Sequence, residues 1–85
     1  MKLKDTVDLM CSEHYENRFL AEYRQTRIRC EKLHALIVKH IAGKLDFKPK
    51  CDVALLEQQE YAMREYLKVL EIRAEVEGID VFELY

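Results

Sequence analysis

The sequence predicts an all-α protein, an antiparallel two-helix hairpin that assembles into a homo-oligomeric helical bundle. Three observations lead to this prediction. Glycine (2) and proline (1) are scarce while charged residues reach 35%, a composition that suits long helices and not a sandwich or barrel. Apolar residues recur at steps of three and four, as on one face of a helix. One turn-forming segment, near Gly43 and Pro49, separates two periodic stretches, so we expect a single domain over residues 1–85.

The first periodic stretch predicts a helix over about residues 5–42, either continuous or broken near Ser12 to leave a short extra helix at the N-terminus. Ser12 is able to cap a helix that starts just after it. From Phe19 onward the apolar positions keep a repeat of about 3.5 residues, which is typical of the seam of a left-handed helix pair. The expected seam residues are Tyr15, Phe19, Tyr23, Thr26, Cys30, Leu33, Ile37 and His40.

Residues 43–51 are predicted to form the loop, residues 52–77 the second helix and residues 78–85 a tail. Asp52 is a favourable N-cap. Two neighbouring stripes run along this helix: Leu56, Gln59, Met63, Tyr66, Leu70 and Arg73 form one, and Leu55, Ala62, Val69 and Val76 form the other. Such an apolar arc is too wide for one partner, so we expect the second helix to pack on at least two neighbours. The first 16 residues and the tail are expected to cover each other or to reach into a neighbouring subunit.

Size and charge favour self-association. A chain of 85 residues buries only about 60% of its unfolded surface, and small scaffolds often oligomerise to compensate. The hydrophobic fraction of 49% exceeds what one seam covers. Residues 1–50 hold 11 Lys/Arg against 7 Asp/Glu, a net of +4, whereas residues 51–85 hold 3 against 9, a net of −6. We expect the basic half to pair antiparallel with the acidic half, within one chain or between chains.

Composition also argues against several functional classes. The net charge of −2 gives no reason to expect general DNA binding, which usually needs a strongly basic domain. The cysteines, Cys11, Cys30 and Cys51, are odd in number and form no C-x-x-C motif, which indicates a reducing cytoplasm. No apolar run approaches the roughly 18 residues that span a bilayer, and the first residues do not resemble a signal peptide. We expect a cytoplasmic protein without membrane contact.

No enzyme signature is present in the sequence. Cys30 and His34 have a spacing that can hold a metal, but no further ligands follow a recognisable pattern, so a seam cysteine beside a histidine is the preferred interpretation. Cys11 and His14 lack an oxyanion-forming turn. Two glycines cannot build a phosphate-binding loop. We therefore expect no catalytic residue, no metal and no cofactor.

Aromatic and basic side chains alternate along the first helix. Aromatic faces stack on nucleobases, and arginine binds phosphate oxygens through paired hydrogen bonds. Tyrosines at a seam are more often part of a core, and arginines beside an acidic helix more often form salt bridges, so both interpretations stay open. The candidate ligand-binding residues are Tyr15, Arg18, Tyr23, Arg24 and Arg27.

The second helix carries the pattern Q-x-x-x-M-x-x-Y-L-x-x-L-x-x-R-A, formed by Gln59, Met63, Tyr66, Leu67, Leu70, Arg73 and Ala74. Over about residues 13–80 the chain resembles a family of small phage and prophage proteins of gut bacteria, the crAss-like phage related proteins. Its architecture is more distantly similar to the anti-CBASS and anti-Thoeris helical-hairpin sponges of phages. Those sponges form homo-oligomers and sequester cyclic oligonucleotides or ADP-ribose-derived signals, with bases on aromatic side chains and phosphates on basic ones.

The resemblance implies a phage-encoded, non-enzymatic binding protein in the cytoplasm of the bacterial host. Its expected role is to sequester a nucleotide immune signal, either a cyclic oligonucleotide or an ADP-ribose derivative. The alternative is a protein–protein interaction module that inhibits or adapts a host protein such as a defence complex. In that case the wide apolar arc of the second helix and the tail, with Phe82 and Tyr85, contact the partner. A minor structural role in the phage is the third hypothesis.

Overall fold

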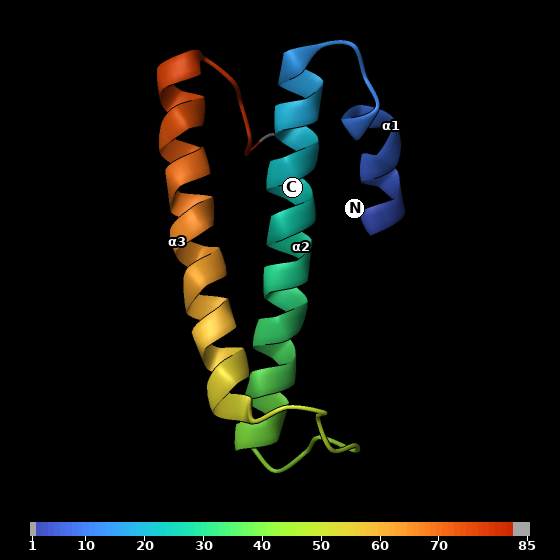
Figure 1. The fold of residues 1–85 in the computed structure, drawn as a ribbon, viewed down its shortest axis with the longest axis vertical. Helices are drawn as coiled ribbons and strands as arrows, with labels where there is room; N and C mark the ends of the chain where they lie inside the picture. Colours follow the sequence, from blue (N-terminus) through green and yellow to red (C-terminus); the bar gives the residue numbers. More distant parts are fainter. Residues whose placement is uncertain (1, 83–85) are drawn as a thin grey trace.

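Four helical segments make up the described part of the computed structural model, residues 2–82. They are the 3-10 helix η1 (Leu3–Thr6) and the α-helices α1 (Val7–Met10), α2 (Tyr15–Ile41) and α3 (Val53–Glu77). The long helices α2 and α3 pack antiparallel, and η1 and α1 lie along the other side of α2 (Figure 1). Residues 2–82 contain no strand, so the predicted all-α class is confirmed. Residues 83–85, the end of the expected tail, lie outside the described range.

The chain leaves the helical path between Met10 and Tyr15, so the structure has the broken form of the first helix. Ser12 organises this break from outside the helix. Its hydroxyl accepts hydrogen bonds from the His14 amide at 3.1 Å and from the Asn17 side chain at 3.0 Å. Its carbonyl accepts one from Arg18 Nη1 at 2.9 Å. These bonds turn the chain so that η1 and α1 fold back along α2.

The connection between the long helices follows from local signals at their ends. Gly43 has φ +73°, and the amide beyond it, that of Lys44, donates to the Lys39 carbonyl at 2.8 Å, which closes the end of α2. At the start of α3, the Asp52 carboxylate accepts from the Ala54 amide at 3.0 Å, as an N-cap does. Gly78, with φ +74°, ends α3 in the same left-handed conformation as Gly43.

The core lies between α2 and α3, mostly at the end of the hairpin away from the loop. Its fully buried members are Phe19, Tyr23, Cys30, Leu67, Leu70, Ala74 and Val81. On α2, the predicted seam is right for Phe19, Tyr23, Cys30 and Ile37, which are all buried. Thr26 and Leu33 are half-buried, whereas Tyr15 and His40, at the two ends of the predicted seam, are exposed.

The predicted seam of α3 is partly wrong. Leu70 is buried as expected, and Leu56 and Met63 are half-buried. The intervening positions differ, because the helix turns Leu67 and Ala74 into the seam and leaves Gln59, Tyr66 and Arg73 exposed. The second stripe, Leu55, Ala62, Val69 and Val76, is exposed along its whole length. Within one chain, α3 therefore packs on α2 and shows a second apolar side to solvent.

The N-terminal segment and the tail both pack on α2. Ala21, Arg24 and Ile28 are buried on the side of α2 that η1 and α1 cover, and Thr6 is the buried residue of that segment. Beyond Gly78 the tail turns back between the long helices (Figure 1), where Val81 joins the core. No helix in residues 2–82 combines the length and apolar character needed to cross a membrane.

Candidate functional site

The hydroxyl of Tyr23 forms a hydrogen-bonded link between α2 and α3. It donates to Glu71 Oε2 on α3 at 2.6 Å and accepts from Arg27 Nη1 at 3.1 Å. Burial and the bond to the Glu71 carboxylate raise the pKa of Tyr23 from 10.0 to about 12. The hydroxyl is therefore neutral at physiological pH, and it positions Glu71 by donating a hydrogen bond and Arg27 by accepting one.

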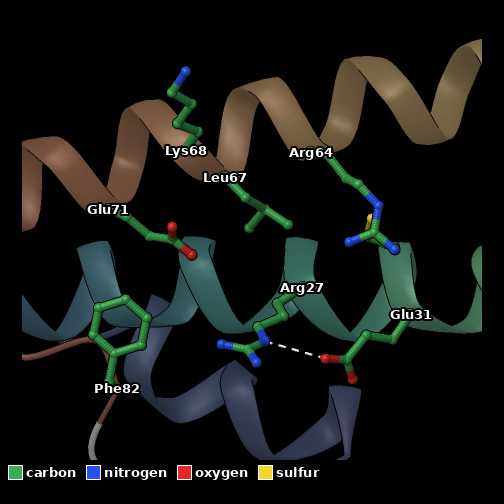
Figure 2. Close-up of a pocket in the computed structure, with 8 residues that line it drawn as sticks. Arg27, Glu31, Arg64, Leu67, Lys68, Glu71 and Phe82 are labelled. Carbon is green, nitrogen blue, oxygen red and sulfur yellow. Dashed lines mark hydrogen bonds and ion pairs between the residues drawn. The ribbon is translucent and has the colours of Figure 1, made fainter.

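A pocket of about 330 Å³ opens between α2 and α3 beside this hydroxyl (Figure 2). Pockets that bind small molecules have volumes of about 300 Å³ or more, so this pocket lies at the small end of that range. The side chains come from both helices and from the tail, and they are Arg27, Cys30, Glu31, Arg64, Leu67, Lys68, Glu71 and Phe82. Buried Leu67 and Cys30 supply apolar surface, and charged groups surround it. We call this set the α2/α3 pocket.

Three basic and two acidic residues line the α2/α3 pocket, and most of these charges are held in place. Arg27 Nε lies 3.1 Å from Glu31 Oε1. Arg64 Nη2 lies 2.8 Å from Glu60 Oε2, and His34 Nδ1 approaches the same oxygen at 2.6 Å. The bond to Glu60 raises the pKa of Arg64. Lys68 is exposed and belongs to none of the ion pairs formed among residues 2–82.

The thiol of Cys30 faces the same pocket but is not set up as a nucleophile. Burial raises its pKa above the ordinary value, because a thiolate is poorly solvated in an apolar surrounding. Within residues 2–82, no group of three or more His, Cys, Asp or Glu side chains is arranged to hold a metal. The groups that line the pocket are three cations, two carboxylates, an aromatic ring and apolar surface.

A second polar cluster ties the start of α2 to the end of α3. The Tyr15 hydroxyl donates to Glu77 Oε1 at 2.7 Å and accepts from Arg73 Nη2 at 2.8 Å. Arg73 also lies over the Phe19 ring, 5.2 Å from its centroid. The bond from Tyr15 to Glu77 raises the pKa of Tyr15 and lowers that of Glu77. This cluster is a structural clasp at the open end of the hairpin.

The five candidate ligand-binding residues do not converge on one site. Arg27 lines the α2/α3 pocket, and Tyr23 lies in the core and binds Arg27. Tyr15 belongs to the clasp, about 12 Å along the helix from Tyr23. Arg18 binds the Ser12 carbonyl at the break before α2. Arg24 is only 5% exposed, on the side of α2 that faces η1 and α1.

Sequence reasoning missed the α3 and tail residues of the pocket, Arg64, Lys68 and Phe82. A signal for two of them was present. Residues 51–85 hold three basic residues, and Arg64 and Lys68 stand four apart on one side of the helix. In an otherwise acidic half, such a pair indicates a local basic site.

The model of the family described as Sequestin matches residues 13–76. This range starts just before α2 and ends one residue before the end of α3, so it covers the hairpin and not η1 or α1. No curated protein and no solved structure matches the chain.

Proposed function

We propose, from the premise that this chain belongs to the Sequestin family, that it is a phage-encoded, non-enzymatic binding protein that sequesters a nucleotide immune signal. The family name itself denotes sequestration. The proposed ligand is a cyclic oligonucleotide or an ADP-ribose derivative, and both classes combine a planar base with phosphate groups. A protein that only holds such a signal lowers its free concentration without changing it chemically.

The observation that supports this proposal most directly is the composition of the α2/α3 pocket. Arg27 and Arg64 offer planar guanidinium groups that suit phosphate oxygens. Lys68 adds a third positive charge. The Phe82 ring lies at the same pocket and is 53% exposed, which leaves surface for contact with a base.

Two of the cations of the pocket are hydrogen-bonded or ion-paired within the chain. Arg27 is held by Tyr23 and Glu31, and Arg64 is held by Glu60. Side chains that already occupy one conformation lose little entropy on binding. A preformed set of cations between two rigid helices is what a tight, passive binder needs.

The test is a melting-temperature screen of the purified protein against cyclic di- and trinucleotides and ADP-ribose derivatives. A ligand at 100 times its dissociation constant stabilises the folded state by about 2.7 kcal/mol, which raises the melting temperature measurably. The pocket variants are Lys68→Ala and Arg27→Gln. The matched control is Lys32→Ala, an exposed lysine two residues from Cys30 and so on the far side of α2.

A selective rise that is lost in Lys68→Ala and Arg27→Gln but kept in Lys32→Ala supports both the function and the site. A rise in melting temperature that all three variants retain would show that the ligand binds outside the α2/α3 pocket. A flat panel from a folded protein contradicts the proposal and favours the host-protein interaction module instead. Arg24 is unsuitable for this test, because it is buried and its removal would disturb the fold.

A further inference from the structure

A groove lies between α2 and the N-terminal segment formed by η1 and α1, on the side of α2 away from α3 (Figure 1). Its volume is about 580 Å³, within the range of about 300–1,000 Å³ that is typical of small-molecule sites. One wall comes from residues 3–11, and the other consists of Gln25 and Arg29 of α2. We call it the N-terminal groove. It is separate from the α2/α3 pocket, because Arg29 stands about 160° around α2 from Arg27, which lines that pocket.

The N-terminal groove contains apolar surface that stays partly uncovered. Leu3, Val7 and Met10 line it at steps of four and three, so they share one side of their segment. Although this segment packs on α2, Val7 is 56% exposed and Met10 is 41% exposed. The α2 residues of the groove are an amide and a guanidinium, which cannot close over apolar surface without the cost of burying their polar groups. The apolar wall is therefore open to a ligand.

Two cations stand beside this apolar wall without a counter-charge. Lys4 and Arg29 are exposed, and they belong to none of the ion pairs formed among residues 2–82. No carboxylate of that range lines the groove. The positions three and four residues from Arg29 carry no Asp or Glu, so α2 supplies no neighbouring partner. The α2/α3 pocket differs in this respect, since Glu31 lies against Arg27 there.

We propose that the N-terminal groove binds a small amphipathic anion, a molecule with an apolar body and one carboxylate-type head group. The apolar body packs on Leu3, Val7 and Met10, and the head group is bound by the charges of Lys4 and Arg29. A nucleotide fits this groove less well, because no aromatic ring of residues 2–82 lines it for a base to stack on. The site goes beyond the proposed function, and η1 and α1 lie before the residues that match the family model.

The test is an NMR titration of the isotope-labelled protein with octanoate and, separately, with octanol, which has the same chain length without the charge. We expect octanoate to shift the backbone amide signals of Val7 and Met10 and the side-chain amide signals of Gln25. Octanol, which lacks the attraction to both cations, should bind about 10-fold more weakly.

Charge-removing variants identify the head-group contacts. Lys4→Gln and Arg29→Gln should each weaken octanoate binding about 2- to 5-fold, and the double variant about 10-fold. The matched control is Lys39→Gln, an exposed lysine of α2 that stands about 15 Å along the helix from Arg29, and it should bind octanoate as wild type does. All three positions are exposed, so the variants are expected to fold.

The cysteines of the chain report independently on the place of binding. Cys11 lines the N-terminal groove, whereas Cys51 lies in the loop between the long helices, and both are exposed. Saturating octanoate should slow the alkylation of Cys11 by iodoacetamide and leave the rate at Cys51 unchanged. Mass spectrometry of the modified peptides measures both rates in one sample.

Three results would overturn the proposal. The first is equal binding of octanoate and octanol, or unchanged octanoate binding in the double variant, since either removes the role of the two cations. The second is a set of shifts confined to other apolar surfaces, with Cys11 and Cys51 alkylated at unchanged rates. The third is a shift of the groove signals with protein concentration alone, which would show that a second copy of the chain occupies the groove.

Discussion

The two halves of the hairpin are built differently. At the open end, Phe19 and Tyr23 of α2 pack against Leu70 and Ala74 of α3, and Val81 of the tail closes the core. Towards the loop, Ile37 is the one fully buried residue of α2 beyond Cys30, and α3 buries none completely before Leu67. At the open end, η1, α1 and the tail pack on the long helices, whereas only α2 and α3 meet towards the loop. The core of this hairpin therefore lies where the short flanking segments add to the helix pair.

The largest expected effect on the free energy of unfolding comes from a substitution in the core at the open end. Leu70→Ala removes a side chain that is 1% exposed and should lower the free energy of unfolding by about 3 kcal/mol, from lost burial and the cavity that remains. Leu56→Ala, at a half-buried position of the loop half, should lower it by only about 1 kcal/mol. Urea denaturation followed by circular dichroism measures both. Equal losses would contradict the difference between the halves.

Next in size is the effect of the buried hydroxyl at the open end. Tyr23→Phe leaves Glu71 and Arg27 without that partner and should cost about 1–2 kcal/mol. The control is Tyr61→Phe, at a position that is 69% exposed, and we expect no measurable change. Urea denaturation at neutral pH compares the two variants with wild type.

The same variant has a defined dependence on pH. The folded state raises the pKa of Tyr23 from 10.0 to about 12, so the folded state holds the proton more tightly than the unfolded state. The stabilisation is therefore complete below pH 10.0 and is lost as pH rises towards about 12. The stability gap between wild type and Tyr23→Phe should narrow over that range. A gap that stays constant would show that the hydroxyl is not the group that titrates.

The smallest effect concerns the loop half. Burial acts to raise the pKa of Glu60, but hydrogen bonds from Arg64 and His34 outweigh it and lower the pKa below 4.5. The stabilisation is therefore present above pH 4.5 and is lost as pH falls through the lowered pKa. Both basic partners are half exposed, so Glu60→Gln should cost only about 0.5 kcal/mol at neutral pH. Melting curves of wild type and variant should converge in acid; divergence there would contradict this assignment.

Helix ends and the seam of α2 were predictable because single residues or a single stripe decide them. Gly43, Asp52 and Gly78 each have a local conformational reason to end or begin a helix. The seam of α3 was harder, because apolar residues occur in adjacent pairs such as Leu55-Leu56, Val69-Leu70 and Tyr66-Leu67. Both members of a pair fit a helical repeat, and only packing against α2 selects one.

Of the five candidate ligand-binding residues, the α2/α3 pocket is lined by Arg27. Alternating aromatic and basic residues on one helix drew attention to it, and its role as a ligand-binding residue stays a prediction. The other lining residues depend on how α3 is rotated against α2 and on where the tail returns. Neither follows from periodicity within a single helix. Arg24 was a candidate ligand-binding residue but is buried on the side of α2 that η1 and α1 cover. That burial depends on the chain break at Ser12, which lets η1 and α1 fold back along α2.

The position of the core at the open end has a consequence for folding kinetics. His34 and Glu60, near the loop, are 26 residues apart in sequence, whereas Tyr15 and Glu77 are 62 apart. Doubling a loop adds only about 0.6 kcal/mol of closure entropy, so reaching the distant contacts first is not much harder than forming the near ones. If the helices paired progressively from the loop, little apolar surface would be buried until the open end of the hairpin had formed. The chain is therefore expected to fold in one cooperative step, with its transition state formed by the residues that are most remote from the loop.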